Sequence, residues 1–368
     1  MPIREESFRI GCGRYLQGAG MISRLGEEVN RLGSAPLIVS GETAWRIAGE
    51  AAENSVKEGC SRYETVIHTG TCNEDDAQII ADLVHEKGYD VIVGIGGGVL
   101  MDFTKLCGYF SKCPVICVPT SSATCAAYTP LSVRYTREGN TVGSRHYPYE
   151  IDGVIVDSAI IATQPVRLLL SGVFDALAKF VEIRHRFKGD LDAEYPIGLD
   201  YAYALAQQSY RFLMEKTAVA ITDMQAGNMT KKLENLIFTT IAATGVVSGI
   251  ARGSNQSALG HKFYETTRFF FPKESRPYLH GEIVGVGLLL QNHFNGEPEA
   301  NDVLLEWMNT YGMPKTVAAV GIDKSKETFE KYYEKIVASS SIDETNAEEC
   351  DRFRASMEYL WNLSCKGE

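Results

Sequence analysis

Short apolar runs alternate with amphipathic stretches along the chain up to about residue 160. Ala35–Val39, Tyr89–Ile95 and Val115–Val118 have the composition of buried strands. Glu74–Lys87 predicts a helix with acidic residues near its start, and a further helix is expected from about Leu100. Alternation of strand and helix predicts a parallel sheet covered by helices, in which ligands bind beyond the carboxyl ends of the strands.

The second part of the chain has a different pattern, with apolar residues at helical spacing and few turn residues. Helices are predicted over Val166–Phe187, Ala202–Met214, Leu233–Val247 and Val284–Phe294. The change falls between Ile161 and Pro165. We therefore expect an α/β domain over residues 1–162 and an α-helical domain over residues 163–368.

A glycine-rich segment, Gly94–Lys105, follows the apolar run Val91–Val93 and leads into residues that can form a helix. A strand, a glycine loop and a helix N-terminus together present backbone N–H groups to an anionic phosphate. Glycine suits such a loop because a Cβ would block close approach. The alternative is an ordinary strand-to-helix turn, since a glycine run alone is weakly specific. Pro119–Thr124 also follows a predicted strand and is expected at the same edge of the sheet.

The composition limits the classes of function. The chain has 368 residues, 45% of them hydrophobic, which is enough for a large core in two domains. Its net charge of −11 argues against a nucleic-acid-binding surface. We expect no membrane span, because no apolar run of about 18 residues occurs, and no signal peptide. The nine cysteines are scattered without a CxxC pair, which indicates free thiols in a reducing cytoplasm. Cys113 and Cys117 flank a predicted buried strand and are not expected to bind metal.

Three residues could together hold a metal ion. His261 and His280 each lie near a predicted helix, and Asp175 is an acid in an otherwise apolar helical run. A buried carboxylate needs a partner, and a divalent cation is a suitable one. Two imidazoles and a carboxylate leave a position for substrate in a catalytic metal site. The spacing alone does not show that the three converge, and a lone histidine is more often a surface or core residue.

The chain resembles the iron-containing alcohol dehydrogenase family, in its glycerol dehydrogenase branch, which shares a fold with dehydroquinate synthase. The glycine motif of that family is matched by Gly96, Gly97, Gly98, Asp102 and Lys105. The second signature is matched by Pro119, Thr120, Thr124, Leu131, Ser132 and Val133. The resemblance implies a dehydroquinate synthase-like fold, and it implies that the metal ligands and catalytic residues are Asp175, His261 and His280.

The same resemblance implies the cofactors and partners. The residues expected to contact NAD(P) are Gly97, Gly98, Asp102, Thr120, Thr124, Thr129, Leu131 and Tyr135. Zinc is the usual metal on three such ligands, although iron, nickel and manganese fit the same donors. We expect a small-molecule substrate and a cytoplasmic homo-oligomer that binds neither nucleic acid nor membrane.

Two departures from the family pattern concern the substrate. Lys179 stands where the iron-dependent branch has a further histidine ligand, and Cys125 stands where glycerol dehydrogenases carry a substrate-binding Asp. Both changes make the chain most similar to bacterial hydroxycarboxylate dehydrogenases, which reduce small 2-oxo acids. A lost carboxylate and a gained ammonium suit an anionic substrate. The alternative is that Cys125 only packs and Lys179 reaches solvent.

Two further departures concern the cofactor and the proton. Gly41 occupies the place of an Asp that binds the adenosine ribose in NAD-preferring relatives. The missing acid favours NADP(H), although Glu42 beside it opposes a 2′-phosphate. Glu265 replaces a proton-transferring histidine, and is either a proton relay or a surface acid. Glycerol dehydrogenase remains an alternative function, as do a dehydroquinate synthase-like cyclase and a non-catalytic nucleotide-binding protein.

Overall fold

The computed structural model describes residues 10–185, 187, 196–251 and 258–364. The chain forms two compact units, which are described separately. The first comprises residues 1–169 and 212–250, and the second comprises residues 170–211 and 251–368. This division differs from the predicted boundary after residue 162, because residues 212–250 return to the first unit. There Gln17 Nε2 donates to the carbonyl of Glu234, and the ring of Tyr15 packs edge-on against Phe238.

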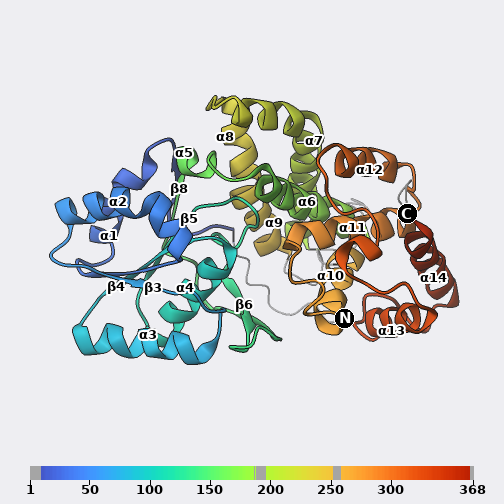
Figure 1. Ribbon diagram of the computed structural model, residues 1–368, viewed down its shortest axis with the longest axis horizontal. Helices are drawn as coiled ribbons and strands as arrows, with labels where there is room; N and C mark the ends of the chain where they lie inside the picture. Colours follow the sequence, from blue (N-terminus) through green and yellow to red (C-terminus); the bar gives the residue numbers. More distant parts are fainter. Residues whose placement is uncertain (1–9, 186, 188–195, 252–257, 365–368) are drawn as a thin grey trace. The chain divides into compact units, whose positions relative to one another are not determined.

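The first unit is built on a parallel sheet with the strand order β1-β8-β5-β4-β2-β3. Its strands are β1 (Tyr15–Gly18), β2 (Pro36–Ser40), β3 (Glu64–Ile67), β4 (Val91–Gly96), β5 (Val115–Pro119) and β8 (Gly153–Asp157). The four inner strands are buried throughout, as expected for a sheet covered on both faces. The covering helices are α1 (Leu25–Asn30), α2 (Glu42–Gly59), α3 (Glu74–Lys87) and α4 (Gly98–Ser111) (Figure 1). The expected α/β class and the predicted strands are confirmed.

A two-stranded antiparallel ribbon of β6 (Leu131–Tyr135) and β7 (Thr141–His146) extends this unit. Two arginines of the ribbon, Arg134 and Arg145, pair with Glu74 at the start of α3. The remaining short elements here are a 3₁₀ turn at Met21–Arg24 and α5 (Ser158–Ile161).

The second unit is helical over the residues that the structure describes. Its helices are α6 (Val166–Ile183), the first part of α7 (Ile197–Gln225), α10 (Leu259–Phe270), α11 (His280–Phe294), α12 (Ala300–Thr310), a 3₁₀ turn at Ala318–Val320, α13 (Lys326–Val337) and α14 (Ala347–Asn362). Helix α6 ends at Ile183, four residues before the predicted end at Phe187. The helices from α10 onward are coloured orange to red in Figure 1.

The sequence predicts one regular helix over Leu233–Val247, but the segment Lys231–Ala251 is interrupted. It consists of α8 (Lys231–Phe238), a π-helical turn (Thr239–Ala243) and α9 (Thr244–Ala251). By length and composition it could cross a membrane, but 61% of its most apolar window is buried inside the protein. Such burial is typical of a core helix in a soluble protein.

Candidate active site

Helix α6 carries charged side chains into the interior of the second unit. Every residue of α6 from position 169 to position 183 is buried. The charged residues in this buried stretch are Asp175, Lys179 and Glu182, at intervals of four and three residues. Side chains at such intervals lie on one face of a helix. The sequence therefore places two acids and one base in a row within an apolar environment.

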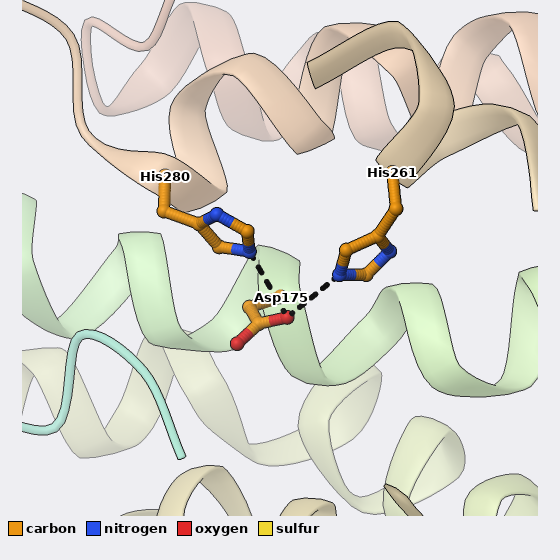
Figure 2. Close-up of side chains that lie close together, drawn as sticks. All are labelled: Asp175, His261 and His280. Carbon is orange, nitrogen blue, oxygen red and sulfur yellow. Dashed lines mark ion pairs between the residues drawn. The ribbon is translucent and has the colours of Figure 1, made fainter. Parts of the chain in front are cut away.

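Two histidines reach this row from α10 and α11. His261 Nε2 lies 3.4 Å from Asp175 Oδ1, and His280 Nε2 lies 3.6 Å from the same oxygen. Figure 2 shows both rings pointing at that carboxylate from one side. One ligand atom from each of the three residues lies within 4.8 Å of the others. The structure thus brings together the three residues that spacing alone could not show to converge.

A glycine fixes the position of His280. The next residue, Gly281, lies so close to α6 that a Cβ there would be 1.8 Å from the carbonyl oxygen of Ser171. The amide of Gly281 donates to Ser171 Oγ at 3.0 Å. Because Ser171 and Asp175 are one helical turn apart, this contact places the first residue of α11 beside the carboxylate. Glu282 then accepts a hydrogen bond from the amide of Leu279 and caps the helix.

The other acid of the row, Glu182, holds His261. Its Oε1 accepts hydrogen bonds of 2.8 Å from the amides of Ala258 and His261, at the start of α10. Its Oε2 is hydrogen-bonded to His261 Nδ1. Glu182 is 1% exposed, so these are contacts of an interior group. Glu182 was not among the residues predicted from the sequence, although its position seven residues after Asp175 on an apolar helix was a signal for it.

The arrangement of charges fits a divalent cation. Asp175 Oδ1 is buried and has no hydrogen-bond partner among the residues that the structure describes, while three nitrogens lie 3.4–3.6 Å from it. Burial opposes ionisation of Asp175, but Lys179 and the histidines outweigh burial and hold its pKa well below normal. Burial lowers the pKa of His280, which favours the neutral ring that a metal ligand requires.

The acidic neighbours of His261 raise its pKa. Burial alone would lower its pKa, but the charge of Glu182 and the hydrogen bonds to Asp175 and Glu182 together outweigh burial and raise the pKa of His261 to about 9. Since Nδ1 faces Glu182 and Nε2 faces Asp175, a cation or a proton must lie on the Nε2 side. The donor set of two imidazoles and one carboxylate suits zinc and other borderline divalent ions.

The residues expected to bind substrate have different surroundings. Lys179 is 5% exposed, and its Nζ lies 3.4 Å from Asp175 Oδ1, so it does not reach solvent. Cys125 belongs to the first unit and is buried there. Glu265 lies on α10 with its side chain 55% exposed and pairs with Lys262. A surface acid with a lysine partner fits this observation, whereas a proton relay needs a buried carboxyl.

The glycine loop lies in the first unit, at the carboxyl edge of the sheet. Gly96 at the end of β4 is in register with Pro119 at the end of β5, so the loops that follow the two strands are neighbours. Gly97 is the N-cap of α4, and no side chain caps this helix. A Cβ on Gly98 would be 2.8 Å from Thr124 Oγ1. The uncapped amides form a cradle that suits a pyrophosphate.

The acid and the lysine of the glycine motif have internal partners. Asp102 Oδ2 accepts the amide of Val133 at 3.0 Å, and Asp102 Oδ1 lies 2.8 Å from Lys105 Nζ. Lys105 is 1% exposed and donates to the carbonyls of Ala126, Thr129 and Leu131. These two side chains therefore fix the segment that carries Thr129 and Leu131. Direct contact of these residues with NAD(P) stays a prediction, as it does for Thr120, Thr124 and Tyr135.

Comparison with known proteins shows the family of the chain. The family described as iron-containing alcohol dehydrogenase matches residues 12–158. Glycerol dehydrogenase of Thermotoga maritima is 32% identical over 316 residues, which are 84% of each chain. The chain belongs to the iron-containing alcohol dehydrogenase family. It is therefore an NAD(P)-dependent oxidoreductase, and its family uses a divalent metal.

One further relative and one solved structure show similarity in sequence and in fold. Hydroxycarboxylate dehydrogenase A of Escherichia coli is 29% identical over 265 residues, 70% of each chain. The solved structure of a probable glycerol dehydrogenase from Sinorhizobium meliloti superposes with a TM-score of 0.81 at 23% identity. It covers 97% of this chain and 98% of its own, which confirms the dehydroquinate synthase-like fold expected from the sequence.

Proposed function

We propose that this enzyme transfers hydride between NAD(P)(H) and a small 2-oxo or 2-hydroxy acid, with a preference for NADP(H). The observation that carries the proposal is the buried ammonium of Lys179, 3.4 Å from the carboxylate of Asp175. An ammonium removed from water needs compensating negative charge. Here it lies beside the candidate metal ligands, where a substrate would bind.

A count of charges shows why an acid suits this site better than a polyol. Asp175 and Glu182 contribute two negative charges, and Lys179 contributes one positive charge. With neutral histidines and a divalent ion, the cluster would carry a net charge of +1. A monoanionic 2-oxo acid neutralises that charge, whereas glycerol or dihydroxyacetone leaves it buried and unpaired. With a neutral residue at position 179 the cluster would already be balanced.

Glycerol dehydrogenase is the second candidate. The relative from Thermotoga maritima has that name, and three others with the same name match at 30% identity. Against it, Cys125 supplies no carboxylate at the position where glycerol dehydrogenases carry one. The hydroxycarboxylate relative has a comparable identity of 29%, so overall similarity does not separate the two substrates.

The protein contributes binding and electrostatics to the reaction. The bound metal supplies Lewis acidity at the carbonyl oxygen, and the nicotinamide supplies the hydride. Asp175, His261 and His280 hold the metal, and Lys179 neutralises the substrate carboxylate. Gly97 and Gly98 seat the pyrophosphate at the start of α4. Lys105 and Asp102 keep the neighbouring segment in place.

The coenzyme preference is supported by the end of β2. Gly41 follows this strand, and a Cβ there would meet no atom of the described residues within 4 Å, so position 41 has room and carries no acid, although Glu42 is next to it. Arg46 lies one turn along α2, where its Nη2 donates to Thr43 Oγ1 at 3.2 Å. An arginine near this position suits a 2′-phosphate. We also propose that the enzyme is a cytoplasmic homo-oligomer, as the family resemblance implies.

The test is a substrate panel with zinc-loaded protein. NADPH or NADH oxidation is followed by absorbance with 2-oxoglutarate, 2-oxobutyrate, dihydroxyacetone and simple aldehydes. Faster turnover with a 2-oxo acid and NADPH supports the proposal. Preference for dihydroxyacetone assigns the glycerol dehydrogenase function instead, and no net oxidation with any substrate supports a cyclase or a non-catalytic protein.

A further inference from the structure

We propose that Glu182 is a positioning residue that selects the metal-binding tautomer of His261. This inference rests on the metal site of the proposed function and adds a requirement to it. The three ligands alone do not make a metal site, because an imidazole can carry its proton on either nitrogen. Only a ring protonated on Nδ1 presents a lone pair at Nε2, the atom that faces Asp175.

Each carboxylate oxygen of Glu182 has its own hydrogen-bond partners. Oε1 accepts two backbone amides, those of Ala258 and His261, each at 2.8 Å. Oε2 faces His261 Nδ1, and a carboxylate without a proton can only accept. The Nδ1 atom must therefore be the donor. Its proton is fixed on the side away from Asp175, and Nε2 is left for a metal ion.

Close packing around Glu182 holds the carboxylate and His261 together. A Cβ on Gly260 would lie 3.2 Å from Glu182 Oε1, so the glycine makes room for the carboxylate. A Cβ on Gly287 would lie 2.6 Å from the carbonyl oxygen of Gly260, which keeps α11 tight against α10. The His261 side chain is 13% exposed and that of Glu182 is fully buried, so water cannot readily replace the carboxylate. The tautomer is set by these contacts within the second unit.

A single isosteric substitution separates this role from simple packing. In Glu182→Gln the amide oxygen can still accept from both backbone amides, so the start of α10 stays capped. The amide NH₂ then faces His261 Nδ1 and donates to it. The ring proton must move to Nε2, toward Asp175, and the lone pair for the metal is lost. Volume and backbone contacts are retained while the tautomer is reversed.

The experiment measures zinc affinity by chelator competition in full-length protein. The variants are Glu182→Gln, His261→Gln as the loss of a ligand, and Glu306→Gln as a matched control on the exposed face of α12. We expect Glu182→Gln to bind zinc about 10- to 100-fold more weakly than wild type, the range found for groups that orient metal ligands. The control should match wild type. Zinc affinity of Glu182→Gln within twofold of wild type would overturn the proposal.

Thermal unfolding in chelator distinguishes positioning from stability. Metal-free Glu182→Gln should unfold within a few degrees of metal-free wild type, and only wild type should gain a large shift on adding zinc. A variant that is strongly destabilised without metal, yet still binds zinc with wild-type affinity, would show that Glu182 only caps α10. Affinity is measured without turnover, so a failed substrate panel would not affect this result. A loss of zinc with unchanged turnover would contradict the proposed function and leave the role of Glu182 intact.

A measurement on the wild-type protein does not depend on substituting Glu182. Long-range ¹H–¹⁵N NMR correlations of zinc-loaded protein report which ring nitrogen of His261 carries the proton. Assignment follows from the signal that disappears in His261→Gln. We expect the proton on Nδ1 and the metal on Nε2. A proton on Nε2 would refute the proposal whatever the variants show.

Discussion

Replacement of Lys179 by methionine should change which substrates the enzyme prefers. Methionine has a similar length and keeps the apolar stem of the side chain, but removes the ammonium beside Asp175. The charge of the metal-loaded cluster falls by one unit, to zero. A 2-oxo acid then loses its charged partner, whereas a neutral ketone loses none.

The expected size of the effect follows from the burial of the group. Lys179 is 5% exposed, so its contact with a substrate carboxylate would be largely shielded from water. A hydrogen bond to a charged group contributes about 1.5–3 kcal/mol. Coulomb attraction at an effective dielectric constant of about 20 and a separation of about 5 Å gives roughly 3 kcal/mol, the upper end of that range. The selectivity should therefore change by about 10- to 150-fold.

The assay compares kcat/KM for 2-oxobutyrate and dihydroxyacetone in zinc-loaded protein. Lys179→Met should lower the value for the acid and leave that for the ketone unchanged or higher. Lys262→Met is the matched control, because Lys262 lies on α10 in a pair with the exposed Glu265. Zinc affinity should not fall, since the ammonium 3.4 Å from Asp175 Oδ1 competes with the metal for that oxygen. An equal loss of activity on both substrates would refute this reasoning.

Three other substitutions test separate parts of the structure. Gly281→Ala places a Cβ 1.8 Å from the carbonyl oxygen of Ser171, so it should move α11 and weaken zinc binding at least about tenfold. Gly285→Ala is the control: its Cβ would meet only side chains, the nearest at 3.1 Å, so this variant should bind zinc nearly as well as wild type. Gly41→Asp should lower the NADPH-to-NADH ratio of kcat/KM by about tenfold or more, because a carboxylate repels the 2′-phosphate; an unchanged ratio would place the ribose elsewhere. Lys105→Met removes the buried ammonium that lies 2.8 Å from Asp102 Oδ1 and donates to three backbone carbonyls, so it should lower the free energy of unfolding in urea by about 3–5 kcal/mol. A loss below about 1 kcal/mol would contradict this role of Lys105.

Local patterns in the sequence were sufficient to place most elements of the sheet domain. Helix α3 has the predicted bounds, Glu74–Lys87, because Asn73 caps its start and Gly88 adopts the left-handed conformation at its end. Strands β2, β4 and β5 each lie within a residue or two of their predictions, since apolar runs bounded by turn residues specify buried parallel strands.

The site was predicted only in part, because its geometry depends on contacts between helices distant in sequence. The approach of Gly281 to Ser171 brings His280 to Asp175, and nothing in the spacing of these residues encodes that distance. Family resemblance supplied the three ligands, but not Glu182. The row of charges on α6 contained that information, since a buried acid one turn beyond Lys179 requires a partner. Local sequence patterns also do not predict how the chain divides into two units, because residues 212–250 return to the first unit through tertiary packing.

Replacement of His261 by alanine tests the metal centre most directly. Wild type and His261→Ala are purified identically, loaded with zinc, and compared for bound metal by mass spectrometry and for NAD(P)H oxidation with the best substrate of the panel. We predict about one zinc per chain in wild type, little in the variant, and a loss of turnover that parallels the loss of metal. Metal content and cofactor oxidation that both persist in His261→Ala would contradict the assignment of this centre.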